Sequence, residues 1–263
     1  MKKIITILLL LAFVSCKKED FKAEFTREFA IQSTSTGANY TIKVALPQNY
    51  NSELQKYATI YVLDGEENFD LVAKICQIIC SERSSTNVLV VSIGYGNDRA
   101  VDYTPTDVAE GGGGAEKFMH FIKDELMPKM EMDFGADSSR KSKTILGHSF
   151  GGLLGAYAFA KFNDVFGNYL MLSPSLWYDN EIVLKYEKEN RSENKKSHQL
   201  VFLGLGEMEN SGRMLAPFEA YYQQLQNNYP DLIIKKSLEP HLSHGGSKNP
   251  NIIKALNFYF QNR

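Results

Sequence analysis

The chain has 263 residues, a formal net charge of −2 and 23% charged residues. This balance excludes the basic footprint of a nucleic-acid-binding protein, so we expect no nucleic-acid partner. Three cysteines are too few for a disulfide-built scaffold, and 8 prolines and 19 glycines are too few for a fibrous chain. The composition predicts a folded globular protein whose function comes from a local site.

The first sixteen residues have the features of an export signal. Lys2 and Lys3 precede an apolar run over residues 4–14, which is too short to span a bilayer, and Cys16 follows. Residues 13–16 resemble the lipobox of bacterial lipoproteins, whereas the alternative is an ordinary signal with an incidental cysteine. We predict a signal peptide over residues 1–15, a lipidated Cys16 with a tether to residue 22, and one domain over 23–263. The protein is then exported and anchored to a membrane by lipid, on a periplasmic or cell-surface face, with the outer membrane favoured.

Short β-branched runs alternate with longer helical patterns along the rest of the chain. Strands are predicted at residues 25–33, 40–46, 57–63, 88–93, 143–146, 169–172, 200–205 and 232–237. Helices are predicted at residues 69–80, 115–130, 151–162, 214–227 and 251–261. This alternation predicts an α/β protein with a mostly parallel central sheet flanked by helices, as in the α/β-hydrolase fold.

The motif G-x-S-x-G at residues 147–151 is the strongest chemical signal. A predicted strand precedes Ser149, and a helix rich in small residues follows it. This is the context of a nucleophile elbow, in which a sharp turn exposes the serine at the edge of the sheet. The N–H of Phe150 would supply one oxyanion donor, and the N–H of Glu66, in the turn after the third strand, would supply the other. The alternative for the motif is a glycine-rich turn with an inert serine.

A serine nucleophile needs a base, and in this fold the chain order is serine, acid, histidine. His244 is the preferred base because it lies between the last strand and the last helix, and glycines follow it. His241 is the runner-up, and His198, in a lysine-rich stretch, is predicted to be solvated. The acid should follow the penultimate strand, where Glu207 and Glu209 both qualify.

Longer stretches resemble the "Putative esterase" family of the α/β-hydrolase superfamily, and most closely its enterochelin (siderophore) esterase branch. They include L-D-G-x, R-x-x-D-Y-T-P, G-H-S-F-G-G, S-P-S-L-W and a G-E-x-E with a later His-Gly-x-Ser, at residues 63–66, 99–105, 147–152, 173–177 and 206–247. The resemblance favours Glu209 over Glu207 as the acid, and it supports His244 although one extra glycine follows it here. Because some siderophore esterases rely on a Ser/His dyad, the resemblance leaves the importance of the acid open.

Three further residues are candidates for substrate binding, each with a structural alternative. Arg99 could hold an anionic or phenolic group, or it could pair with Asp102, which we favour. Tyr103 and Trp177 could line the substrate cleft or cap the core.

The sequence as a whole predicts a serine carboxylic-ester hydrolase that needs no cofactor and no metal. The substrates implied by the resemblance and by export are small-molecule esters, such as siderophore esters or carbohydrate-linked acyl esters. The rival interpretations are an acyltransferase of the same fold and a catalytically silent surface-binding lipoprotein.

Overall fold

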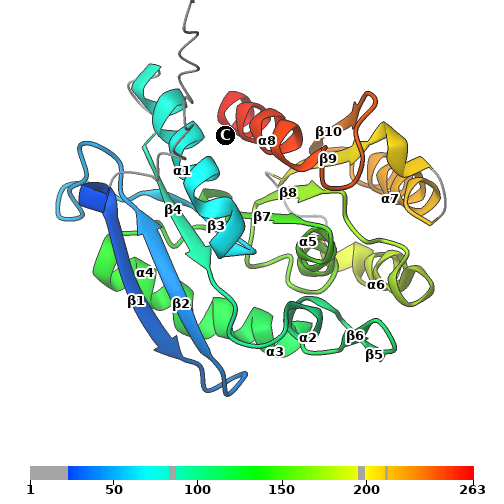
Figure 1. Cartoon of the computed structure of the whole chain (residues 1–263), viewed down its shortest axis with the longest axis horizontal. Helices are drawn as coiled ribbons and strands as arrows, with labels where there is room; N and C mark the ends of the chain where they lie inside the picture. Colours follow the sequence, from blue (N-terminus) through cyan, green and yellow to red (C-terminus); the bar gives the residue numbers. More distant parts are fainter. Residues whose placement is uncertain (1–22, 83–86, 195–198, 211–212) are drawn as a thin grey trace, which may run out of the picture.

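The computed structural model describes residues 23–82, 87–194, 199–210 and 213–263. Within these residues, one eight-stranded sheet has the order β1-β2-β4-β3-β7-β8-β9-β10 (Figure 1). Its strands are β1 (Thr26–Gln32), β2 (Asn39–Ala45), β3 (Ala58–Val62), β4 (Val88–Ile93), β7 (Lys143–His148), β8 (Asn168–Leu172), β9 (Gln199–Gly206) and β10 (Leu232–Glu239). Strand β2 is antiparallel to β1 and β4, and the other neighbours are parallel. The predicted fold class is confirmed.

The helices are α1 (Gly65–Glu82), α2 (Arg99–Tyr103), α3 (Ala115–His120), α4 (Met127–Phe134), α5 (Phe150–Lys161), α6 (Tyr178–Asn194), α7 (Leu215–Asn228) and α8 (Lys248–Asn262). A π-helical turn, η2 (Phe121–Leu126), joins α3 to α4. The short turns are η1 (Ala23–Phe25), η3 (Arg140–Ser142) and η4 (Glu207–Asn210), and β5 (Asp107–Val108) pairs with β6 (Gly111–Gly112) as a small hairpin. None of the helices in the described ranges is long and apolar enough to cross a membrane.

Two apolar clusters cover the two faces of the sheet. Helices α1 and α8 pack on one face, where Val72 and Leu256 contact the buried strands. Helices α3 to α7 lie on the other face, whose core is larger and rich in aromatic rings (Figure 1). Both faces of the central strands are therefore buried, which explains their nearly continuous apolar sequences.

The sequence pattern did not predict α6, and the reason lies in what that helix buries. Apart from Tyr178, Val183 and Leu184, its buried positions are Glu187 and Asn194, which are polar. The Glu187 carboxylate is satisfied by Arg191 in the next turn and by the hydroxyl of Tyr229. A search for apolar residues at helical spacing cannot recognise a face that is completed by a buried carboxylate and its arginine partner.

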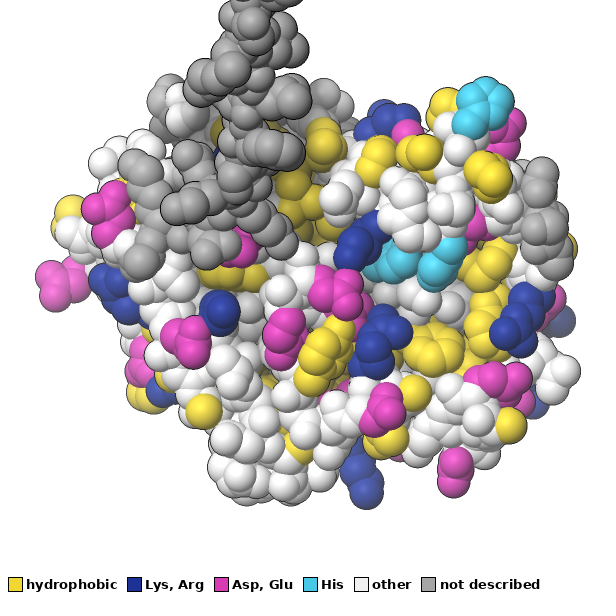
Figure 2. All heavy atoms as spheres, viewed as in Figure 1, with side chains coloured by type: hydrophobic (Ala, Val, Ile, Leu, Met, Phe, Trp, Pro, Cys, Tyr) yellow, Lys and Arg dark blue, Asp and Glu magenta, His cyan; other side chains and the backbone are white. Residues whose placement is uncertain are grey.

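The fold gathers the chemistry-bearing residues at one edge of the sheet. The parallel strands β3, β7, β9 and β10 all end there, and ligands bind at this edge in such sheets. The residues that follow these strands are Asp64, Ser149, Glu209 and His244. Figure 2 shows histidine side chains side by side on one face, with basic, acidic and hydrophobic side chains around them.

Candidate active site

Ser149 occupies a strained turn between β7 and α5. Its φ is +61° and its ψ is −117°, a conformation that costs a non-glycine residue about 1–3 kcal/mol and persists only where the surroundings impose it. The backbone is held from both sides, because Ser149 N–H donates to the Leu172 carbonyl at 2.9 Å and its carbonyl accepts from Ser175 N–H at 3.2 Å. A Cβ at Gly147 would lie 2.4 Å from the Gly151 carbonyl, so only glycine fits there. The elbow predicted from the motif is present.

A cleft of about 380 Å³ opens above Ser149. It is lined by Arg99, Ser149, Phe150, Ser175, Trp177, Met208, Glu209, Arg213, Met214 and His244. The predicted nucleophile, base and acid therefore share one cavity. A second hollow of about 240 Å³ meets the first at Arg99, Ser149 and His244, and its lining also includes the charged residues Glu67 and Lys248.

His244 and Glu209 form a hydrogen-bonded pair at the cleft. His244 Nδ1 lies 2.7 Å from Glu209 Oε2. The other oxygen of this buried carboxylate accepts from Gly206 N–H and from the hydroxyls of Ser173 and Ser247, at 2.7, 2.7 and 3.2 Å. Burial by itself raises the pKa of Glu209, but the bonds from His244, Gly206 and Ser173 outweigh it and hold the pKa below its ordinary value. An ionised Glu209 can therefore orient the imidazole and stabilise its cation.

The alternative acid and base lie on the surface and pair with each other. Glu207 accepts from the His241 N–H at 2.8 Å, and the His241 side chain is 92% exposed. His198 lies outside the described residues, as do residues 1–22 with Cys16. Among the described residues, no hydrogen bond joins Ser149 to His244, and the Ser149 Oγ contacts Ser175 Oγ at 3.4 Å. Nucleophile–base bonds in free enzymes are often long until substrate binds.

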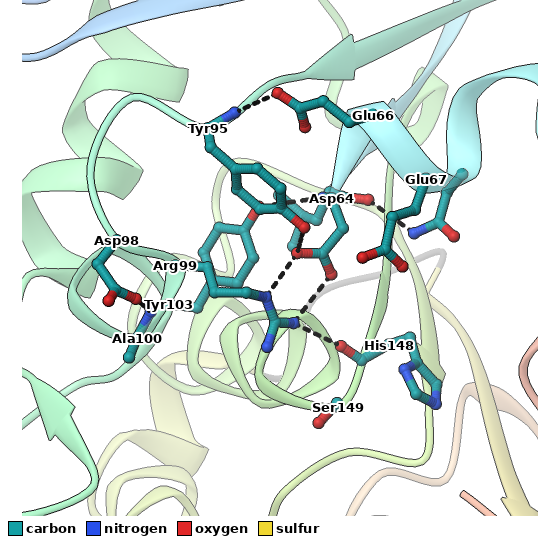
Figure 3. Close-up of polar contacts among 12 residues, drawn as sticks. Asp64, Glu66, Glu67, Tyr95, Asp98, Arg99, Ala100, Tyr103, His148 and Ser149 are labelled. Atoms are coloured by element: carbon teal, nitrogen blue, oxygen red, sulfur yellow. Dashed lines mark hydrogen bonds and ion pairs between the residues drawn. The ribbon is translucent and has the colours of Figure 1, made fainter. Parts of the chain in front are cut away.

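The two predicted oxyanion donors lie in the first turns of two helices. Phe150 is the first residue of α5, and Glu66 lies in the first turn of α1. The first N–H groups of a helix have no partner within the helix, and they favour negative charge. The Glu66 carboxylate accepts from the Tyr95 N–H at 2.8 Å, so it faces away from Ser149 (Figure 3).

Arg99 does not pair with Asp102, so the favoured structural prediction for it is wrong. Its guanidinium forms two bonds with Asp64, at 2.8 and 3.0 Å (Figure 3). Asp102 instead accepts from the Tyr40 hydroxyl at 2.8 Å and from the Asn97 amide at 3.1 Å. The short separation of Arg99 and Asp102 suggested a pair, but α2 begins at Arg99 and turns Asp102 into the core.

Of the two aromatic candidates, only Trp177 lines the cleft. The Arg213 guanidinium lies over its ring at 3.4 Å from the centroid, so the two side chains form one wall. Tyr103 is 2% exposed, and its hydroxyl accepts from the Asp64 N–H at 3.0 Å, which is the core-capping alternative. Arg213 belongs to no motif, so no signal in the sequence marks it as a residue of the cleft.

His148 is a further residue at the site that the sequence did not single out. Its Nε2 lies 3.0 Å from the His244 carbonyl, and the two imidazole rings are 4.6 Å apart. Burial and the neighbouring His244 lower the pKa of His148 to about 4, so it is neutral at pH 7 and its Nε2–H donates to that carbonyl. His148 occupies a variable position of the G-x-S-x-G motif, which is why the motif did not mark it.

Lowering the pH from 7 to 5 should reduce the free energy of unfolding of the wild type more than that of a His148→Gln variant. An unfolded histidine binds its proton near pH 6.5, whereas folded His148 stays neutral down to about pH 4. Between these two pH values the unfolded state binds more protons than the folded state. The free energy of unfolding therefore decreases as the pH is lowered, by roughly 1–2 kcal/mol between pH 7 and pH 5. Urea unfolding of both proteins at each pH measures the difference, and equal losses would contradict the assignment.

The fold and the elbow define an α/β-hydrolase that carries a serine at the nucleophile position. The profile of the family described as "Putative esterase" matches residues 33–244, and the chain belongs to this family.

Relatives and solved structures extend the comparison. The chain is 31% identical over 176 residues to the ferri-bacillibactin esterase BesA of Bacillus subtilis, covering 58% of this chain and 60% of that protein. It is 27% identical over 176 residues to the siderophore triacetylfusarinine C esterase of Aspergillus fumigatus, covering 62% and 60%. The chain thus spans about three fifths of the length of these two relatives. The solved BES protein from Bacillus cereus superposes with a TM-score of 0.81 at 26% identity, covering 92% of this chain and 98% of that one.

Proposed function

We propose that the protein is a serine carboxylic-ester hydrolase that works through an acyl-enzyme. The observation that carries the proposal is the single cleft in which the strained Ser149 meets the hydrogen-bonded pair of His244 and Glu209. A serine needs an adjacent base to be nucleophilic at neutral pH, and a base needs a partner that fixes its tautomer. Because Glu209 is hydrogen-bonded to Nδ1 of His244, the Nε2 atom is available to accept the serine proton.

The reaction then follows from these positions. Ser149 Oγ attacks the ester carbonyl carbon while His244 accepts the hydroxyl proton, and the Phe150 and Glu66 N–H groups bind the oxyanion. The tetrahedral intermediate collapses, the bond to the leaving oxygen breaks, and His244 protonates that oxygen, which departs as the alcohol. Water repeats the sequence on the acyl-enzyme and releases the acid.

We propose siderophore esters or carbohydrate-linked acyl esters as substrates. Two observations support this choice. One relative compared above is named a ferri-bacillibactin esterase and the other a siderophore triacetylfusarinine C esterase. The wall built from Trp177 and Arg213 offers an aromatic face and a cation, which suit planar or anionic acyl groups.

We further propose that the protein is exported and anchored through acyl chains on Cys16. The support is the sequence alone: two lysines, the apolar run over residues 4–14 and the cysteine that ends it. Palmitate labelling of the full chain, absent in a Cys16→Ser variant, tests the anchor.

Soluble protein that begins at Lys17 tests the activity. We expect it to hydrolyse short p-nitrophenyl esters at pH 7 and to gain the mass of one phosphonyl group at Ser149 after treatment with a fluorophosphonate. Siderophore and feruloyl esters then define the substrate, and an added acceptor alcohol separates hydrolysis from acyl transfer. A well-folded protein that binds esters tightly without turnover or labelling would overturn the proposal in favour of a silent binding protein.

A further inference from the structure

A buried carboxylate lies next to the proposed oxyanion site and takes no part in the proton transfers. The Asp64 side chain is 5% exposed. Its Oδ1 atom accepts from Arg99 Nε at 2.8 Å and from the Tyr95 hydroxyl at 3.0 Å, and its Oδ2 atom accepts from Arg99 Nη2 at 3.0 Å (Figure 3). Such a two-point guanidinium–carboxylate pair fixes orientation as well as distance.

The backbone of Asp64 sets the position of one oxyanion donor. Its φ is +52°, a left-handed conformation that is uncommon for residues other than glycine. Its N–H donates to the Tyr103 hydroxyl, and its carbonyl accepts from the N–H groups of Glu67 and Asn68, which form the first turn of α1. The N–H of Glu66 lies within that turn, so the direction in which it points depends on the conformation of Asp64.

The same ion pair reaches the other oxyanion donor. Arg99 Nη2 lies 3.4 Å from the His148 carbonyl, directly before the nucleophile, and its guanidinium carbon lies 5.7 Å from the centre of the Phe150 ring. Asp64 Oδ2 lies only 3.3 Å from where a Cβ on Gly151 would be, so the carboxylate packs against the first turn of α5. The β3–α1 turn and the elbow therefore meet at one ion pair.

We infer that Arg99 and Asp64 are positioning residues that fix the two oxyanion donors, Glu66 N–H and Phe150 N–H, relative to each other. This inference rests on the proposed function, and it assigns the Asp64–Arg99 pair a role in transition-state binding. It replaces the interpretation of Arg99 as a residue that holds an anionic substrate.

The charges favour positioning over anion binding. The Arg99 charge is neutralised at contact distance by Asp64, and two of its nitrogen atoms already donate, to Asp64 and to the His148 carbonyl. An anionic ester at this point would face the Asp64 carboxylate as well as the guanidinium. Oxyanion donors, in contrast, act through fixed geometry, so a displacement of about 1 Å is enough to lower the rate by a factor of about 100.

The variants Arg99→Lys and Asp64→Asn test the inference with two esters of different charge. Lysine keeps the positive charge but cannot make the two-point contact. We expect both variants to lower kcat by about 10- to 100-fold, with KM changed less than about threefold, on neutral p-nitrophenyl acetate and on anionic mono-p-nitrophenyl succinate alike. A loss confined to the succinate ester and to KM, with Asp64→Asn unaffected, would overturn the inference and restore an anion-binding Arg99.

A second readout needs no turnover. Phenylboronic acid forms a tetrahedral adduct with an elbow serine and places an oxygen at the oxyanion donors, so calorimetry reports the quality of that site directly. We expect its affinity to fall in each variant in parallel with kcat, and the double variant to be no worse than the worse single variant. Unchanged affinity, or losses that multiply in the double variant, would count against a shared positioning role. A wild type that hydrolyses no ester would contradict the proposed function. The boronic acid affinities of the wild type and the variants would still test whether Arg99 and Asp64 position the oxyanion donors.

Two further variants separate positioning from general stability. Asp102→Asn is the matched control, because Asp102 is also a buried acid, lies three residues from Arg99 and bonds Tyr40 and Asn97 instead. It should lower the thermal midpoint while kcat stays within about twofold of the wild type. Tyr95→Phe is a milder change that serves if Asp64→Asn fails to fold, because it removes only one hydrogen bond from Asp64. It should lower kcat by several-fold. A Tyr95→Phe protein with wild-type kcat and boronic acid affinity would overturn the inference.

Discussion

Replacing Ser149 with alanine should lower kcat by roughly 10⁴- to 10⁶-fold, the range seen when a residue of a serine catalytic triad is removed. Alanine keeps the backbone and the volume at the elbow but has no oxygen to attack the ester. Alanine is also no easier than serine to place at a φ of +61°, so the free energy of unfolding should change little. Steady-state hydrolysis of p-nitrophenyl esters, with urea unfolding of the same preparations, measures both quantities.

Ser142→Ala provides the matched control. Ser142 directly precedes the first residue of β7, at the opposite end of the strand from Ser149, and its hydroxyl bonds Asp137. This variant should keep the wild-type rate. A Ser149→Ala protein that retains more than a few per cent of wild-type kcat would show that the elbow serine is not the nucleophile.

Replacing His244 with alanine should also lower kcat by several powers of ten, because the serine then has no base. His241→Ala is a sharp comparison, since His241 lies three residues away in the same loop and its side chain is 92% exposed. It should change kcat by less than about twofold. Rates of the two variants at pH 7 give the comparison, and a severe loss in His241→Ala with activity kept in His244→Ala would reverse the assignment of the base.

The elements that the sequence predicts well are those with a strong local pattern. The strand before Ser149, the glycines of the elbow and the helix after it specify the turn within a few residues. The preference for His244 and Glu209 over His241 and Glu207 agrees with the burial and pairing in the structure. The catalytic roles of these residues remain predictions until the variants are measured.

Contacts that depend on sheet order could not be predicted from the sequence. Asp64 and Arg99 are 35 residues apart, and Asp102 offers Arg99 a nearer carboxylate along the chain. Strand β7 pairs with β3, with Leu63 N–H donating to the Leu146 carbonyl, and this pairing brings Asp64 beside the elbow. The role of His148 could not be predicted for a similar reason. Its contact with the loop before α8 forms only when the fold brings β7 and that loop to the same edge of the sheet.

The sheet order has a consequence for how the protein would lose activity on heating. The proposed acid and base follow β9 and β10, and within the described part of the chain β10 is an edge strand with no neighbour on its outer side. The proposed nucleophile follows β7, which is paired on both sides. Edge elements open with a smaller free energy than central strands. Local fraying of β10 would separate His244 from the elbow while the core stays folded, so inactivation should precede the cooperative unfolding transition. Contacts that hold β10 to β9 and to α8, such as the ion pair of Lys254 with Glu239, are thus the natural targets for extending the working temperature.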